Sequence, residues 1–144
     1  MLAVDTNILV YAHRREAREH EKALETLRAL VEGDEAWAIP WPCLYEFFSV
    51  VTNTKIWKDH ASTAAQAVAQ IEAWVSSPTV RLIGETEDFL QTLPSLLKVS
   101  KVRGPMVHDA RIAAICVAHA VEALLTRDRD FSIFGALKVR NPLE

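Results

Sequence analysis

The chain contains only two cysteines, four glycines and six prolines among its 144 residues. The cysteines, Cys43 and Cys116, cannot build a disulfide framework, and they lack the C-x-x-C spacing of a zinc site. Both lie in apolar segments, so we expect them to be buried free thiols. The scarcity of glycine and proline argues against a flexible linker or a low-complexity tail, and the length fits one domain over residues 1–144.

Long hydrophobic runs are also missing. No apolar stretch approaches the length of a membrane span, and Met1 is followed directly by a short apolar segment, without the basic region of a signal peptide. We therefore expect a cytoplasmic protein with no membrane partner. Of all residues, 50% are hydrophobic and 24% are charged, which is the profile of a globular domain.

The chain has no large excess of charge of either sign. Its net charge is −3, from 16 basic and 19 acidic residues. This balance argues against a broad, sequence-independent surface for nucleic acid. It does not exclude nucleic acid at a localised site, because setting aside four carboxylates for a metal leaves 15 acidic residues against 16 basic ones.

Short apolar segments alternate along the chain with stretches in which apolar residues recur every three or four positions. The short segments predict strands at Leu2–Asp5, Glu35–Ile39, Val80–Ile83, Ala123–Leu125 and Leu137–Val139. The periodic stretches predict helices at Asn7–His13, Glu16–Glu32, Pro42–Asn53, His60–Val75, Phe89–Ser100 and Asp109–Ala120. This alternation predicts a three-layer α/β/α domain, with helices on both faces of a mostly parallel sheet of roughly four to five short strands.

Four acidic residues lie at the ends or in the interior of these apolar segments: Asp5, Glu46, Asp109 and Asp128. Carboxylates in such places are costly unless they are compensated, and carboxylates that gather together also repel one another. Asp5 and Asp128 each follow a predicted strand, and parallel sheets bind ligands beyond the carboxyl ends of their strands. A divalent cation shared by these groups would offset both costs, so the pattern predicts a metal-dependent hydrolase.

The motifs around these residues are Val4-Asp5-Thr6-Asn7, the buried Glu46, His108-Asp109-Ala110 and the run from Leu125 to Phe131. Together they resemble the PIN-domain ribonucleases, and the VapC-type toxins of bacterial toxin–antitoxin pairs in particular, over essentially the whole chain. The resemblance implies a PIN-like fold and an acidic quartet that holds Mg²⁺ or Mn²⁺. It also implies an endoribonuclease that hydrolyses RNA with a metal-activated water and leaves a 3′-hydroxyl and a 5′-phosphate.

Three polar residues beside the quartet are candidates for supporting roles. Asn7 and Thr126 could orient carboxylates or waters, although such residues also cap helices and turns. Asp130 lies two residues after Asp128, so either could be the ligand. The family pattern favours Asp128, which leaves Asp130 to brace the turn.

Contacts with RNA phosphates are expected from basic residues that have no acidic neighbour. The segment with Lys98, Lys101 and Arg103 meets this condition, and the pair Arg14 and Arg15 is the second candidate. A solvated loop is the alternative explanation for these charges. His108 could touch the substrate, but a polar residue at a helix start is the commoner occurrence.

The resemblance implies two protein partners, a second copy of the chain in a homodimer and a VapB-type antitoxin. The predicted helices between Pro42 and Val75 also carry large apolar side chains, which often mark an interface: Phe47, Phe48, Trp57 and Trp74. For all four tryptophans of the chain, we expect core or interface packing rather than base stacking.

Other functions remain open on the sequence. An aspartyl-phosphate phosphatase needs a second aspartate two residues after Asp5, where this chain has Asn7. A flap-type DNA nuclease carries a larger acidic set and long insertions. A catalytically weak domain that binds RNA or a partner would gain nothing from an intact quartet. A housekeeping RNA-processing nuclease would share the site, and the sequence does not identify which RNA is cut.

Overall fold

The computed structural model describes residues 1–144 and contains one five-stranded parallel sheet, in the order β3-β2-β1-β4-β5. The strands are β1 (Leu2–Val4), β2 (Trp37–Pro40), β3 (Val80–Ile83), β4 (Ala123–Leu125) and β5 (Val139–Arg140). The central strand β1 pairs with β2 on one side and with β4 on the other. The predicted α/β class with a parallel sheet is therefore confirmed.

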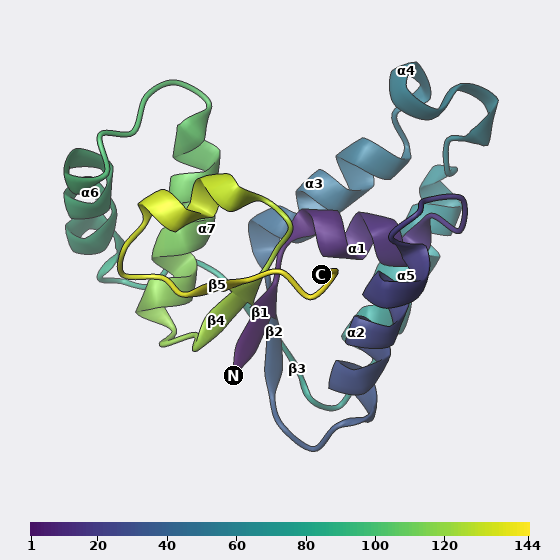
Figure 1. Cartoon of the computed structure of the whole chain (residues 1–144), viewed down its shortest axis with the longest axis horizontal. Coiled ribbons are helices and arrows are strands. Elements are labelled where there is room, and N and C mark those ends of the chain that lie inside the picture. Colours follow the sequence, from purple (N-terminus) through teal and green to yellow (C-terminus); the bar gives the residue numbers. More distant parts are fainter.

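Helices cover both faces of this sheet. They are α1 (Thr6–His13), α2 (His20–Glu32), α3 (Trp41–Val51), α4 (Thr54–Trp57), α5 (Ala64–Val75), α6 (Phe89–Val99) and α7 (Met106–Ala118). Two short 3₁₀ helices, η1 (Lys58–His60) and η2 (Arg129–Ile133), follow α4 and β4. In Figure 1, α6 and α7 lie on one side of the sheet and α1, α2, α3 and α5 on the other.

Several predicted element boundaries were wrong, each for a local reason. The second helix begins at His20 rather than Glu16, because Arg14 and Glu16 pair within a turn that precedes it. Helix α7 begins at Met106 rather than Asp109, directly after Pro105, whose φ of −61° already suits a helix. The last strand begins two residues later than predicted because Leu137 closes a turn on Phe134 before the strand starts.

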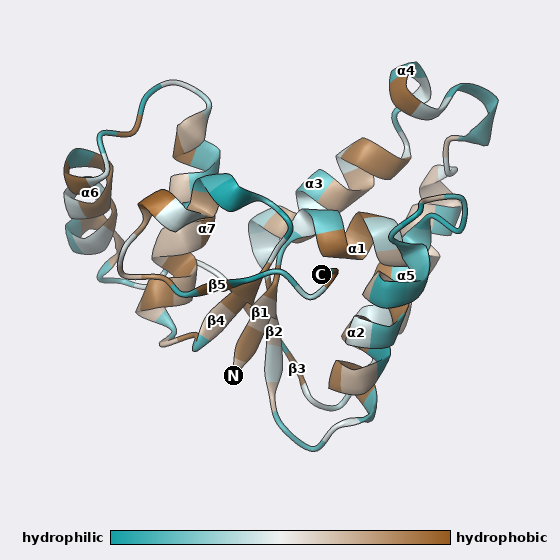
Figure 2. Cartoon of the chain, viewed as in Figure 1, coloured by the Kyte–Doolittle hydropathy of each residue, from teal (hydrophilic) through white to brown (hydrophobic).

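A cluster of 28 buried residues forms the hydrophobic core between the sheet and the two helical layers. The strands β1 and β4 are strongly apolar in Figure 2, in keeping with their place at the centre of the sheet. Cys43 and Cys116 are both buried and free, as predicted. No helix of the chain combines the length and the apolar composition that a membrane span requires.

The large aromatic side chains of α3 and α5 point inward more than expected. Phe47 is fully buried and Trp74 is 6% exposed, and their rings meet edge to face with centroids 4.8 Å apart. Trp37 is also fully buried in β2. Phe47 and Trp74 are therefore core residues, because their exposed area is too small for a partner to contact. For Trp74 this is one of the two alternatives expected from the sequence, and the suggestion of an interface does not hold for these two side chains.

Candidate active site

The four acidic residues of the predicted quartet line one cavity of about 400 Å³ at the carboxyl edge of the sheet, here called the acidic cavity. Asp5 follows β1, Glu46 lies in α3, Asp109 lies in the first turn of α7 and Asp128 follows β4. Thr6, Asn7, Val10, Tyr11, Val50 and Trp57 complete the lining. Four elements that are far apart in the sequence thus deliver one carboxylate each.

Asp5 is the most deeply buried member, with 4% of its surface exposed. Its Oδ1 caps α1 by accepting from the backbone N–H of Thr6 at 2.8 Å. Its Oδ2 accepts from the Thr126 hydroxyl at 2.7 Å and from the Asn7 amide at 3.1 Å. Burial is the main reason that the pKa of Asp5 is raised to about 6; the nearby carboxylates Glu46 and Asp109 also raise it, and the hydrogen bonds from Thr126 and Thr6 lower it.

Glu46 is held by a residue to which the sequence analysis gave no role. The hydroxyl of Thr6 donates to Glu46 Oε2 at 2.7 Å, which ties the start of α1 to the middle of α3. Thr6 therefore serves two carboxylates, Asp5 through its backbone and Glu46 through its side chain. The position of Thr6 between Asp5 and Asn7 was the only sequence signal for a role in the site. Its partner Glu46 is 40 residues away, and only the fold brings the two together.

Asp109 and Asp128 enter the acidic cavity from α7 and from the end of β4. Burial, followed by repulsion from Asp128 and Glu46, raises the pKa of Asp109 to about 6. Asp128 caps η2 by accepting from the backbone N–H of Asp130 at 2.8 Å. Asp130 itself is exposed and does not line the cavity, so the geometry favours Asp128 of the two.

Asn7 and Thr126 link the first and last parts of the site. The Asn7 amide nitrogen donates to the Thr126 hydroxyl at 3.0 Å as well as to Asp5, and its carbonyl accepts from the Arg127 N–H at 3.1 Å. The Thr126 hydroxyl also accepts from the Asp128 N–H at 3.0 Å. Both residues therefore combine the two roles that the sequence left open, since they contact a carboxylate and also fix the turn after β4.

The donor set of this cavity fits a hard divalent cation. Its lining includes four carboxylates and no lysine, arginine or histidine. Burial, and then the neighbouring carboxylates, raise the pKa values of Asp5 and Asp109, and a bound cation would offset both effects. No three Asp, Glu, His or Cys side chains of the chain lie close enough together to form a complete metal-binding group. Mg²⁺ tolerates this, because it retains several waters and needs only one or two direct carboxylates.

The basic residues expected to contact RNA lie outside the acidic cavity. Arg14 is only 6% exposed, and its guanidinium donates to Glu16 and to the His60 carbonyl, so it is not an open contact for phosphate. Arg15 is exposed. Lys101 and Arg103 are exposed on the loop that leads into α7, and His108 lines a separate small cavity with Glu46.

Comparison with known proteins agrees with this architecture. A family model described as PIN domain matches residues 2–137. Ribonuclease VapC43 of Mycobacterium tuberculosis is 31% identical over 144 residues, covering 100% of this chain and 97% of the relative. Ribonuclease VapC48 of the same species is 29% identical over 138 residues, covering 96% of this chain and 94% of the relative.

Solved structures show the same fold at lower identity. VapC20 of Mycobacterium tuberculosis, described as a toxin that cleaves the sarcin–ricin loop, superimposes with a TM-score of 0.70 at 20% identity over 98% of this chain and 100% of its own. VapBC2 of Rickettsia felis, bound to a promoter DNA fragment, superimposes with a TM-score of 0.70 at 19% identity over 97% of each chain. Since the PIN model and a relative more than 30% identical both span nearly the whole chain, the chain belongs to the PIN-domain family and, within it, to the VapC-type ribonucleases.

Proposed function

We propose that this chain is the toxin of a toxin–antitoxin module and cleaves RNA internally in a reaction that depends on Mg²⁺ or Mn²⁺. The main support is the acidic cavity, where Asp5, Glu46, Asp109 and Asp128 converge from four elements. When bound, the cation would supply an activated water for attack on phosphorus and would offset charge on the phosphate. As the water oxygen bonds to phosphorus, the bond from phosphorus to the 3′ oxygen would break and that oxygen would take up a proton from solvent, leaving a 3′-hydroxyl and a 5′-phosphate.

The chain's own residues would prepare the carboxylates for this cation. Thr126 and Asn7 hold Asp5 in one orientation, and Thr6 holds Glu46, so these two carboxylates lose little side-chain freedom when a cation binds. Asp109 enters the acidic cavity from α7, and Asp128 enters it from the end of β4, the strand beside β1. Val10, Val50, Tyr11 and Trp57 form an apolar part of the wall, which lowers the local dielectric and strengthens the attraction between carboxylates and cation.

Three partners belong to this proposal. The substrate is RNA, a VapB-type antitoxin restrains the enzyme, and two copies of the chain form a homodimer. Residues 1–144 form a single PIN domain in this proposal. An antitoxin arginine or lysine placed over the acidic cavity would find four carboxylates and no competing cationic side chain. Apolar side chains exposed on α3, α4 and α5 could serve the homodimer: Tyr45, Ile56, Val68 and Val75.

The proposal is tested with purified protein and labelled single-stranded RNA. We expect cleavage with Mg²⁺ or Mn²⁺, none in excess EDTA, and products that carry 5′-phosphates, with matched single-stranded DNA as the comparison substrate. The Asp109→Asn variant controls for contaminating nucleases. Activity that persists in chelator, or products that end in 2′,3′-cyclic phosphate, would show that the metal-dependent mechanism is wrong.

A further inference from the structure

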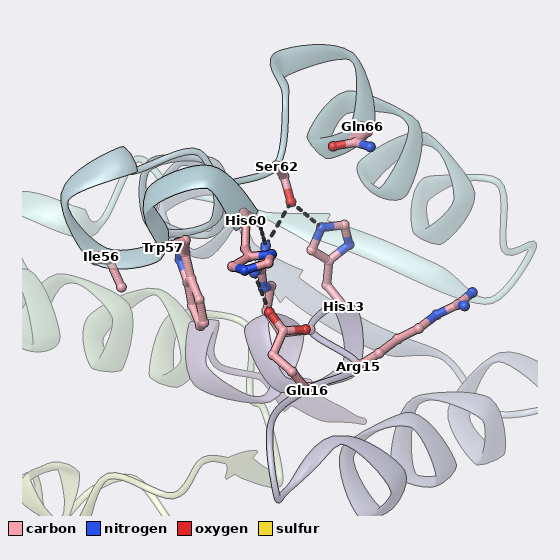
Figure 3. A pocket seen from close by; sticks show the side chains of 9 residues that line it. His13, Arg15, Glu16, Ile56, Trp57, His60, Ser62 and Gln66 are labelled. Carbon is pink, nitrogen blue, oxygen red and sulfur yellow. Dashed lines mark hydrogen bonds and ion pairs between the residues drawn. The ribbon is translucent and has the colours of Figure 1, made fainter.

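A second cavity, of about 630 Å³, adjoins the acidic cavity. It lies between the end of α1 and the segment from α4 to α5 (Figure 3). We call it the Arg15 cavity. Six of its nine lining residues carry the argument: His13, Arg14, Arg15, Glu16, Trp57 and His60. Trp57 lines both cavities. The two are neighbours along α1 as well, since Tyr11 faces the acidic cavity and His13 faces the second one.

The two cavities have opposite electrostatic character. The acidic cavity holds four carboxylates and no cationic side chain, so it cannot by itself attract the phosphates that flank a cleaved bond. The Arg15 cavity is lined by two arginines and one carboxylate, that of Glu16, so its formal charge is positive, and two histidines add ring nitrogens that can form hydrogen bonds. A strand that continues from the acidic cavity past Trp57, which lines both cavities, therefore reaches a site with arginine side chains.

Other arginines near the acidic cavity are occupied by carboxylates of the chain. Arg111 pairs with Glu85, and Arg127 pairs with Glu19. Arg129, the remaining arginine close to Asp128, faces Glu144 at 3.7 Å. In contrast, the side chain of Arg15 makes no ion pair or hydrogen bond in the structure, and neither does the ring of His60. These two side chains have donors free for phosphate oxygens.

Arg14 holds this cavity in shape. Its guanidinium stacks 4.0 Å from the centroid of the Trp57 ring, and it donates to the His60 carbonyl at 2.8 Å and to the Ser62 hydroxyl at 3.3 Å. It also pairs with Glu16, while its Nε is buried without a partner. Arg14 thus fixes Trp57 and His60 against α1, and Glu16 offsets only part of the positive charge of the cavity.

We propose that the Arg15 cavity binds the backbone of single-stranded RNA beside the cleaved bond, with His60 as a donor to one phosphate and Arg15 as a donor to a further phosphate along the strand. This inference rests on the proposed ribonuclease function and adds a binding site to it. In Figure 3, Trp57 and Ile56 lie at one end of the cavity and Arg15 extends at the other. The strand would leave the acidic cavity at Trp57, pass His60 and run toward Arg15.

The test measures RNA binding by the full chain in the Asp109→Asn background, which prevents cleavage. The probe is a fluorescent single-stranded RNA pool of random sequence, roughly 12 nucleotides long, read by anisotropy over a range of salt concentrations. We expect Arg15→Ala to weaken binding about tenfold and to lower the slope of log K against log salt by about 0.7. The matched control is Arg18→Ala, an exposed arginine on the same connection between α1 and α2 that lines neither cavity.

The outcomes separate this inference from the function on which it rests. A loss with Arg15→Ala and none with Arg18→Ala supports the site. Equal losses, or no loss with Arg15→Ala while the wild-type chain still cleaves RNA, would overturn the site and leave the nuclease standing. A variant that keeps RNA binding but loses inhibition by a protein partner would assign the cavity to that partner. Failure of the wild-type chain to bind or cleave RNA would remove the proposed function itself.

Discussion

The hydroxyl of Thr126 donates to Asp5 Oδ2 at 2.7 Å, although 121 positions separate the two residues in the chain. The contact joins the end of β4 to the end of β1, and Thr126 accepts two further hydrogen bonds there, from the Asn7 amide and from the Asp128 N–H. One buried hydroxyl therefore orients a carboxylate of the acidic cavity and also fixes the turn that carries another.

Thr126→Val removes this hydroxyl at nearly constant volume. It leaves the Asn7 amide and the Asp128 N–H without one acceptor, so we expect a loss of roughly 1–3 kcal/mol in the free energy of unfolding. Because the hydrogen bond from Thr126 lowers the pKa of Asp5, its removal should raise that pKa further. Urea denaturation and the pH dependence of RNA cleavage check both effects.

The control for that variant is Thr26→Val, which removes an exposed hydroxyl that bonds only to a carbonyl of its own helix. We expect its unfolding free energy to stay within about 0.5 kcal/mol of the wild type. If the two variants are equally stable and equally active, the hydroxyl of Thr126 does not orient Asp5.

Asp109→Asn removes one negative charge from the acidic cavity at similar volume. We expect this variant to be inactive when metal is supplied. In metal-free conditions we expect it to be at least as stable as the wild type, by ~1 kcal/mol, because it no longer places a charged carboxylate in a partly buried site and because repulsion with Asp128 and Glu46 falls. Thermal unfolding in EDTA measures the difference, with the exposed Asp34→Asn as the control for a general charge effect. A clearly lower melting temperature for Asp109→Asn would identify Asp109 as a structural residue.

The stability of the metal-free protein should fall as pH rises. Asp5 has a pKa of about 6 in the folded chain and an ordinary value of 3.8, so the folded state binds its proton more tightly than the unfolded state does. The contribution of Asp5 to the free energy of unfolding is fully present below its ordinary pKa. It is lost as the pH rises through the pKa of the folded state, and the total loss is up to roughly 3 kcal/mol for this buried group. Asp109 acts in the same direction.

Melting temperatures in EDTA at constant ionic strength, between about pH 5 and pH 7, measure the upper part of this loss, which begins near the ordinary value of 3.8. Excess Mg²⁺ should flatten the profile, because a bound cation stabilises the ionised carboxylates. Glu16 and Glu85 have lowered pKa values and act in the opposite direction, but they titrate below this window. A melting temperature that rises across the window in EDTA would contradict the assignment.

Expression of the wild-type chain alone should arrest bacterial growth, and Asp5→Ala should relieve the arrest. The reason is that cleavage of cellular RNA needs the acidic cavity, and Asp5 is its most buried carboxylate. Colony counts after induction provide the measurement, and circular dichroism of the purified variant verifies folding. Normal growth with abundant, folded wild-type protein would move the function from toxin to RNA processing.

Sequence patterns could predict the parts of the site that depend on local order. The strands before Asp5 and Asp128 are short apolar runs, and the rule that parallel sheets bind ligands at their carboxyl edge brings both residues together. Glu46 and Asp109 were reached through the family motif as well as through their apolar surroundings.

The rest depended on contacts between distant segments. The bond from Thr6 to Glu46 spans 40 positions, and the stacking of Arg14 on Trp57 joins α1 to α4. Nothing in the local sequence distinguishes Arg14, which is buried, from Arg15, which is exposed. The sequence could not decide between core and interface for Phe47 and Trp74 for the same reason, since that requires knowing which face of α3 packs on α5.

The position of β1 between β2 and β4 has a consequence for the moment at which the enzyme becomes active during synthesis. A ribosome that has made β1, β2 and β3 has yet to make Thr126 and Asp128, and the central strand still lacks its neighbour on one side. A nascent or prematurely terminated chain therefore has no complete carboxylate set. For a protein that cleaves RNA, this order of synthesis postpones activity until β4 and the turn after it have been made, and it gives a partner time to bind.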